Sequence, residues 1–247
     1  MPIVLLHGWG MTPLAWQAMI AALGDEGREV HAPALPGHDA RTTRPPASLA
    51  AWAEALAATL PPAAVLIGWS LGALLALELA RTRPQRVARL ILIGATPRFA
   101  AAPDWPHGVD TATVSAFISD YNRHPAATLR RFLALQTLGD AARRRLLPVL
   151  EAACVPHAGH ALPALADGLR ILADADLRTD LAAITPPIHL IHGDGDALMP
   201  LAAARWLADA LPHARLSVLE NRGHAPLLSN PGECAALIRP DLGAAED

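Results

Sequence analysis

The chain has 247 residues, of which 52% are apolar, and a formal net charge of −3. That length suits one α/β domain with an insertion, or two small domains, with enough apolar side chains to bury a sizeable core. The negative charge disfavours a general nucleic-acid-binding surface. No run reaches the roughly 18 apolar residues of a membrane span, and the start "MPIVLLHG" does not resemble a signal peptide. We therefore expect a cytoplasmic protein with neither a nucleic acid nor a membrane as partner.

The two cysteines, Cys154 and Cys234, lie far apart in the sequence and form no CxxC pair. We interpret them as reduced thiols of the core, which suits a reducing compartment. The histidines form no convincing metal site, so we expect no metal and no organic cofactor.

Short apolar runs alternate along the chain with longer segments of helical spacing. The runs that we predict as strands cover 2–8, 29–35, 63–68, 87–95, 187–193 and 214–221. The helices predicted between and after them cover 12–23, 48–59, 71–81, 200–210 and 226–238. Strands that are apolar on both faces and separated by helices indicate a mostly parallel sheet covered by helices on both faces. The sequence therefore predicts the α/β class.

The alternation stops between about residue 96 and residue 181. This stretch has four helical segments, at 110–122, 126–137, 139–152 and 162–173, and no predicted strand. Several prolines mark its two ends, as is common at domain boundaries. We predict a core formed by residues 1–96 and 182–247, with a helical cap inserted over residues 97–181.

The motif "GWSLG" at 68–72 lies between an apolar run and a long helical segment. A turn from strand to helix this tight forces its central residue, Ser70, into a strained backbone conformation. The flanking Gly68 and Gly72 let the neighbouring chain approach closely, so the hydroxyl is exposed at the carboxyl edge of the sheet. The context favours a nucleophilic serine over a serine that merely caps a helix.

A serine hydroxyl needs a base, and the base needs an acid that orients it. In folds of this class the acid follows a late strand and the histidine follows the last one. The loop "GDGDALMP" offers Asp194 and Asp196, of which we choose Asp196 and interpret Asp194 as a turn residue. His224, in "NRGHAP" after the last predicted strand, is the expected base.

The loop "HGWG" after the first predicted strand should complete the site. We expect the backbone N–H groups of Trp9 and Leu71 to form an oxyanion hole, because both would point at the oxygen of the carbonyl that Ser70 attacks. We interpret His7 of the same loop as a packing and hydrogen-bonding residue, not as a base.

The segments "LLHGWG", "LPGH", "GWSLG", "GDGDALMP" and "GHAP" follow one another along the chain. Together they resemble the α/β-hydrolase superfamily. The tryptophans of "HGWG" and "GWSLG", with "DWP" at 104–106 and "FLALQTLG" at 132–139, further resemble the pimeloyl-acyl-carrier-protein methyl ester esterases of biotin synthesis. The likeness covers nearly the whole chain. It implies a serine carboxylesterase that releases methanol from the methyl ester of a pimeloyl group on acyl carrier protein.

The resemblance also implies roles for individual residues. Ser70, Asp196 and His224 would form the catalytic triad, and Trp9 and Leu71 would line the substrate pocket beside Ser70 and His224. The segment "FLALQ" would line an acyl channel under the cap through Phe132, Leu133, Ala134, Leu135 and Gln136.

The chain departs from the superfamily at its start. Members usually carry two strands before the one that ends in "HG", whereas this chain starts directly on that strand. Either the start is truncated or the sheet is smaller. We expect the difference to affect stability more than chemistry, because those strands would lie at a sheet edge far from the triad.

Arginine is concentrated in residues 123–145, which hold six arginines and a single acidic residue, Asp140. Such a segment is either a set of solvated helix faces or a docking patch for an acidic partner. The resemblance supports docking of acyl carrier protein, and by motif position Arg131 and Arg144 are the expected contacts. We expect the protein itself to be a monomer.

Two other functions remain possible from the sequence. The same fold and triad would serve a broad-specificity short-chain carboxylesterase or a thioesterase. A ligand-binding protein of the α/β-hydrolase fold is a further alternative, although such proteins often have damaged triads and this chain has all three triad residues.

Overall fold

The computed structural model describes residues 1–247 except 25–26, 40–43, 156–160 and 244–247. Within the described residues the strands form one sheet in the order β2-β1-β3-β4-β5-β6. Every neighbouring pair is parallel. The strands are β1 (Ile3–Leu6), β2 (Val30–His31), β3 (Ala64–Trp69), β4 (Val87–Ile93), β5 (Ile188–Gly193) and β6 (Ala214–Leu219). All six predicted strands are present, and the predicted α/β class is confirmed.

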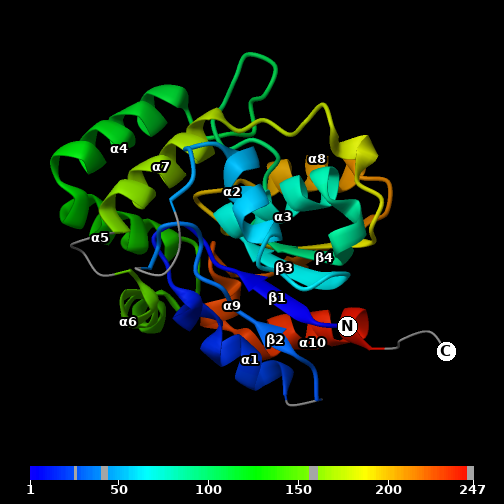
Figure 1. Ribbon diagram of the computed structural model, residues 1–247. Helices are drawn as coiled ribbons and strands as arrows, with labels where there is room; N and C mark the ends of the chain where they lie inside the picture. The colour runs from blue at the N-terminus through cyan, green and yellow to red at the C-terminus, as the bar shows by residue number, and fades with distance from the viewer. Residues whose placement is uncertain (25–26, 40–43, 156–160, 244–247) are drawn as a thin grey trace.

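Helices cover both faces of the sheet (Figure 1). The helices on one face are α2 (Leu49–Ala57), α3 (Leu71–Thr82) and α8 (Leu201–Ala210), and those on the other are α1 (Gln17–Leu23) and α10 (Pro231–Leu242). Val4 and Leu6 of β1 join the core cluster on the α3 side, while Ile3 and Leu5 join the cluster on the α10 side. Since successive side chains of a strand point to opposite faces, a strand covered on both sides must be apolar throughout.

Four helices lie between β4 and β5 in the chain: α4 (Thr111–Arg123), α5 (Pro125–Gln136), α6 (Arg143–Ala153) and α7 (Ala161–Asp174). They correspond to the four helical segments predicted for the insertion. In Figure 1 they gather beside the sheet, on the side toward which β1 points. The division into a core of residues 1–96 and 182–247 and a cap of residues 97–181 stays a prediction.

The remaining elements are short. Three are 3₁₀ turns, η1 (Pro13–Trp16), η2 (Pro84–Arg86) and η3 (Leu181–Ala183), and one is a single-turn helix, α9 (Pro226–Ser229). The predicted helix at 12–23 therefore begins as the 3₁₀ turn η1 before α1, with Thr12 accepting a hydrogen bond from the Leu14 amide.

Three predicted boundaries were wrong. The strand predicted over 29–35 is only two residues long, because Pro33 has no N–H for the ladder and the Leu35 amide donates to His7 Nε2 instead. The helix predicted over 226–238 is two helices, since Pro231 disfavours the helical conformation at Asn230, whose side chain caps α10. The helix predicted from residue 139 starts at Arg143.

Candidate active site

Ser70 lies on the turn between β3 and α3. Its backbone φ is 57° and ψ is −117°, a conformation that L-residues rarely adopt and that costs about 1–3 kcal/mol. The glycines of the motif are required by close packing. A Cβ on Gly72 would lie 2.1 Å from the Leu6 carbonyl oxygen, and one on Gly68 would lie 2.5 Å from the carbonyl oxygen of Gly72. The turn therefore has the strained geometry that the sequence motif predicted.

Asp196 and His224 follow β5 and β6, and their side chains meet. His224 Nδ1 lies 2.7 Å from Asp196 Oδ2, and both residues are buried. The other carboxylate oxygen, Oδ1, accepts hydrogen bonds from the amides of Leu198 and Met199, each at 2.9 Å. Burial alone would raise the pKa of the Asp196 carboxyl, but the neighbouring His224 and His192 and the hydrogen bond from the Met199 amide together outweigh it, and the pKa is lowered. The carboxylate is thus held ionised against the imidazole. Asp194, in contrast, is exposed.

Ser70 and His224 both contact the end of β4. The Ser70 amide donates to the Ile93 carbonyl at 3.0 Å, and a Cβ on Gly94 would lie 3.1 Å from His224 Cε1. The indole of Trp69, the residue before the serine, donates to the His224 carbonyl at 2.9 Å. Within the described residues no direct hydrogen bond joins the Ser70 hydroxyl to the imidazole. Such contacts are often long before substrate binds.

The predicted oxyanion donors flank the serine. A Cβ on Gly8 would lie 3.3 Å from Ser70 Cβ, so the loop that carries Trp9 packs against Ser70. Leu71 is the first residue of α3, where the backbone amides have no partner within the helix. The Trp9 indole donates to the Leu165 carbonyl of α7 at 2.7 Å, which holds the loop in place.

His7 has the packing role expected of it. Its Nδ1 lies 2.9 Å from the Gly8 carbonyl oxygen and its Nε2 accepts from the Leu35 amide. Burial, helped by the neighbouring His38, lowers the pKa of His7 to about 3. A neutral imidazole with both nitrogens in use is a structural group of the loop.

An apolar cavity of about 200 Å³ lies between the inserted helices and the loop of Asp196. Phe132 and Leu135, both predicted for the acyl channel, are part of its wall. The other wall residues are Phe99, Val109, Thr113, Val114, Phe117, Ile118, Leu169, Leu172, Ala197 and Leu198.

The rest of the predicted channel segment is not part of the described wall of this cavity. Leu133 packs in the core cluster on the α10 side, Ala134 is half-buried, and Gln136 is buried at the end of α5. Trp9 lies behind the wall, with its ring edge-on to Phe132 at 4.8 Å between centroids. Consecutive helical residues point in different directions, which is why a five-residue run cannot line one channel.

The wall residues from α4 and α7 were not predicted. Their signal was the apolar spacing of α4 and α7, which indicates a buried face but does not say whether that face meets a core or a cavity. Gly168 was missed as well. A Cβ there would lie 2.8 Å from Trp9 Cδ1 and 3.4 Å from Leu71 Cδ2, so this residue of α7 leaves space for the side chains of both expected oxyanion donors.

The sequence profile described as the alpha/beta hydrolase family matches residues 3–237. The chain belongs to this family. Its relatives include proteins that carry the name pimeloyl-[acyl-carrier protein] methyl ester esterase. The protein from Aromatoleum aromaticum is 52% identical over 241 residues, which cover 96% of this chain and 96% of the relative. The protein from Nitrosomonas europaea is 38% identical and covers 93% of this chain and 90% of the relative.

A solved structure of another protein shares the fold of this hydrolase. The esterase EaEST from Exiguobacterium antarcticum superposes with a TM-score of 0.85, and the alignment covers 98% of this chain and 92% of that one. The two sequences are 22% identical. At that identity the likeness supports the architecture alone.

The hydrolase contains a second serine–histidine–aspartate arrangement. His189 Nδ1 lies 2.7 Å from Asp241 Oδ2, and its Nε2 lies 2.8 Å from Ser217 Oγ. The carboxylate of Asp241 also accepts hydrogen bonds from Arg89 and Arg215. Ser217 lies inside the regular strand β6, with no strained turn. We assign this group a structural role, since it joins β4, β5, β6 and α10 through their side chains.

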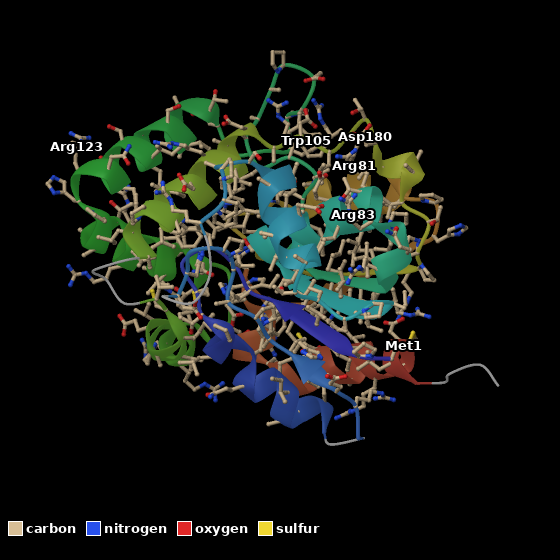
Figure 2. All side chains as sticks on the ribbon, in the orientation of Figure 1. Met1, Arg81, Arg83, Trp105, Arg123 and Asp180 are labelled. Carbon is tan, nitrogen blue, oxygen red and sulfur yellow. The ribbon has the colours of Figure 1, made fainter. Side chains whose placement is uncertain are left out.

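The arginines of the helices between β4 and β5 differ in their contacts. Arg131 lies 2.9 Å from Asp120 and stacks over the ring of Phe117. Arg123, at the outer end of α4 (Figure 2), also lies 2.9 Å from Asp120. Arg144 is exposed, and in the described part of the hydrolase it has no ion pair. Of the two arginines predicted to dock a carrier, Arg144 is therefore the more available.

Other properties of the hydrolase concern its thiols and charged clusters. Cys154 and Cys234 are both free, and burial raises the pKa of each thiol to about 12. Over the described ranges no group of three or more histidine, cysteine or acidic side chains is arranged to hold a metal ion. No described helix combines the length and the apolar character needed to cross a membrane.

Proposed function

We propose that this hydrolase is a serine esterase that hydrolyses the methyl ester of pimeloyl-acyl carrier protein in biotin synthesis. The observation that carries the proposal is the 2.7 Å contact between His224 Nδ1 and Asp196 Oδ2 beside a strained Ser70. The substrate class follows from the relative of 52% identity, named for that activity and matched over almost its whole length.

The proposed reaction uses only groups of the chain. His224 Nε2 takes the proton of the Ser70 hydroxyl as Oγ attacks the ester carbonyl, and Asp196 stabilises the imidazolium that forms. His224 then returns the proton to the departing methanol, which leaves an acyl-enzyme. Water attacks that ester in the same way, with His224 as base, and releases the free carboxyl group.

The Trp9 and Leu71 amides would stabilise the oxyanion of each tetrahedral intermediate. Both lie beside Ser70, and the Leu71 amide is at the positive end of α3. Loss of one such donor costs about 3 kcal/mol of transition-state stabilisation. The rigid packing of Trp9 against Phe132, with its indole bonded to Leu165, supports this assignment because an oxyanion donor must be fixed before the reaction begins.

The apolar cavity next to Asp196 is the proposed site for the methylene chain of the pimeloyl group. Phe132, Leu135 and the wall residues of α4 and α7 offer almost no polar group to a ligand. Such a wall suits an uncharged methylene chain, since burial of an unpaired charge there would be costly.

Acyl carrier protein would dock on the insertion through exposed arginines. Arg144 is the strongest candidate, together with its neighbours Arg143 and Arg145, all exposed at the start of α6. Arg131 could contribute only if a partner's acidic group shared it with Asp120. Guanidinium groups bind carboxylate and phosphate oxygens well, which suits an acidic carrier.

The apolar cavity also favours a second candidate, a broad-specificity short-chain carboxylesterase or thioesterase. Turnover of the methyl ester of pimeloyl-acyl carrier protein should be compared with turnover of a simple butyrate ester. If the proposal is right, kcat/KM is higher for the carrier-bound ester, and expression of this chain restores growth of a biotin auxotroph that lacks this step. Equal rates on both esters, without growth, would favour the broad esterase. Failure of the chain to react with a fluorophosphonate would favour the interpretation as a ligand-binding protein.

The docking proposal has its own test. We expect Arg144→Glu to lower kcat/KM for the carrier-bound ester about tenfold, which corresponds to about 1.4 kcal/mol, and to leave turnover of the butyrate ester unchanged. Arg205→Glu is the matched control, because Arg205 is exposed on α8, which lies at the opposite end of the molecule from α6 in Figure 1. Equal losses on both substrates would contradict docking at Arg144.

We also propose that the protein acts as a monomer in the cytoplasm. The two free thiols, Cys154 and Cys234, are consistent with that reducing compartment. Size-exclusion chromatography with light scattering would test the monomer.

A further inference from the structure

A carboxylate of the insertion contacts the loop that carries His224. Asp140 is buried in the turn between α5 and α6. Its Oδ2 accepts hydrogen bonds from the Gly223 amide at 3.1 Å and the Ser229 hydroxyl at 2.6 Å, and its Oδ1 accepts from the Ala142 amide at 2.7 Å. Gly223 directly precedes His224, so this carboxylate holds the backbone next to the imidazole.

The backbone of the same turn contacts both loops of the proposed triad. The Ala141 amide donates to the Asn221 carbonyl of the histidine loop at 3.0 Å. A Cβ on Gly139 would lie 1.8 Å from the carbonyl oxygen of Gly195, the residue before Asp196. The Gly195 amide in turn donates to the Arg222 carbonyl at 2.9 Å. The turn, the acid loop and the histidine loop therefore form one hydrogen-bonded unit.

The chemistry of Asp140 fits this place better than other residue types would. Its three partners are two amides and a hydroxyl, and all three donate to it. Only a group that accepts at both oxygens satisfies all of them. An asparagine would present an NH₂ group to one or more of these donors, and a buried donor left without an acceptor costs about 1–3 kcal/mol.

His224 already has two other supports, at different atoms. Asp196 holds the ring at Nδ1, and the Trp69 indole donates to the backbone carbonyl. Neither contact fixes the amide side of the residue, where the chain enters from Gly223. The bond from Gly223 to Asp140 supplies that third point.

We propose that Asp140 is a positioning residue for His224. Through the Gly223 amide it fixes the histidine loop so that Nε2 faces Ser70 while Asp196 holds Nδ1. The inference rests on the proposed function of Ser70 and His224. The turn that contains Asp140 also leads into Arg143, the first residue of α6, so the proposed carrier-facing helix and the base are held by the same carboxylate.

The kinetic test compares Asp140→Asn with a control of similar cost to stability. In Ser48→Ala the cap of α2, which accepts from the Ala51 amide, is lost at about 1 kcal/mol, and within the described residues this cap shares no hydrogen bond with Asp140 or its partners. On a p-nitrophenyl butyrate substrate we expect Asp140→Asn to lower kcat about 10- to 100-fold, since a misplacement near 1 Å can cost that much. KM should change little, and the pH profile of kcat should shift. Ser48→Ala should behave as wild type.

Ser229→Ala is the milder second variant. It removes one donor to Asp140 and leaves the Gly223 bond in place, so we expect it to fold and to lower kcat less than Asp140→Asn. A kcat and a pH profile equal to those of Ser48→Ala in both Asp140→Asn and Ser229→Ala would overturn the proposal.

A measurement that does not need catalysis separates this inference from the proposed function. The proton between His224 Nδ1 and Asp196 should give a downfield NMR signal, assigned by its loss in His224→Ala. We expect Asp140→Asn to shift or broaden that signal and Ser48→Ala to leave it unchanged. If wild type hydrolyses no ester while the signal still depends on Asp140, the esterase proposal fails and the positioning role stands. A signal unchanged in Asp140→Asn contradicts positioning.

Discussion

At the scale of single residues, the site depends on backbone that ordinary side chains do not tolerate. Ser70 has a φ of 57°. Gly94 has a φ of 56°, and the ring of His224 packs against the position where a Cβ on Gly94 would lie. The strain at Ser70 is maintained because the strand before it and the helix after it are both well packed. A serine in a relaxed turn would not present its hydroxyl in the same way.

The strain at Ser70 should appear as a difference in the free energy of unfolding between two variants at this position. Ser70→Ala keeps the Cβ, whereas Ser70→Gly removes the clash at positive φ, so we expect the glycine variant to be more stable than the alanine variant by about 1 kcal/mol after the entropy cost of glycine. Urea unfolding of both inactive proteins measures the difference. Ala63→Gly is the matched control. Ala63 is exposed and has a φ of 51°, so glycine there should also raise the free energy of unfolding. A glycine variant at position 70 that is less stable than the alanine variant contradicts the strain.

At the scale of elements, the two ends of the insertion are joined to each other. The Leu177 amide donates to the Pro97 carbonyl at 3.0 Å, and Asp176 accepts from Arg98 at 2.5 Å and from Arg178 at 2.8 Å. The guanidinium of Arg178 also lies over Trp105. These contacts lie where the chain enters and leaves the four helices, so they fix the insertion relative to the sheet.

The charge of Asp176 should stabilise this junction. Hydrogen bonds from Arg178 and Arg98 outweigh burial and hold the pKa of Asp176 below its usual range. Since the pKa is lower in the folded chain, the contribution is present above about pH 4 and is lost as pH falls. We expect Asp176→Asn to lower the unfolding free energy by about 1 kcal/mol at pH 7, after allowance for partial exposure.

The control for this junction is an exposed ion pair. Asp180 lies 3.5 Å from Arg81, and both are labelled in Figure 2. Asp180→Asn should change the unfolding free energy by almost nothing. Urea titrations at pH 7 and pH 3 compare the two variants. A loss in Asp176→Asn that stays the same at both pH values would mean that charge is not the cause.

At the scale of the whole molecule, two buried histidines make stability depend on pH. His7 and His38 lie with their ring centroids 5.3 Å apart. Burial lowers the pKa of His38 to about 4 and, together with His38 itself, that of His7 to about 3. In the unfolded chain both would titrate near 6.5. Unfolding therefore takes up protons below that pH.

The sign of this effect is fixed by the direction of the pKa shifts. The stability due to neutral His7 and His38 is complete above about pH 6.5 and falls by up to about 1.4 kcal/mol per pH unit for each histidine as pH drops toward 4. We expect His38→Phe, which can keep the edge contact with Trp52, to lower the measured slope by up to about 1.4 kcal/mol per pH unit. Urea unfolding from pH 4 to pH 7 measures it. His213→Asn, at an exposed position, should leave the slope as in wild type, and an unchanged slope in His38→Phe would contradict the assignment.

The sequence by itself determined the order of strands and helices and the residues that carry the proposed chemistry. Apolar runs of strand length predicted the positions of all six strands, although β2 is only two residues long. Local motifs and the order of the elements pointed to Ser70, Asp196 and His224 as the proposed triad. Only the tertiary structure decided which residues surround them. The contact of Asp140 with Gly223, the space that Gly168 leaves for Trp9, and the wall of the cavity each join segments far apart in the sequence. Periodicity shows that a residue is buried, whereas the partner it meets depends on how the inserted helices pack against the sheet.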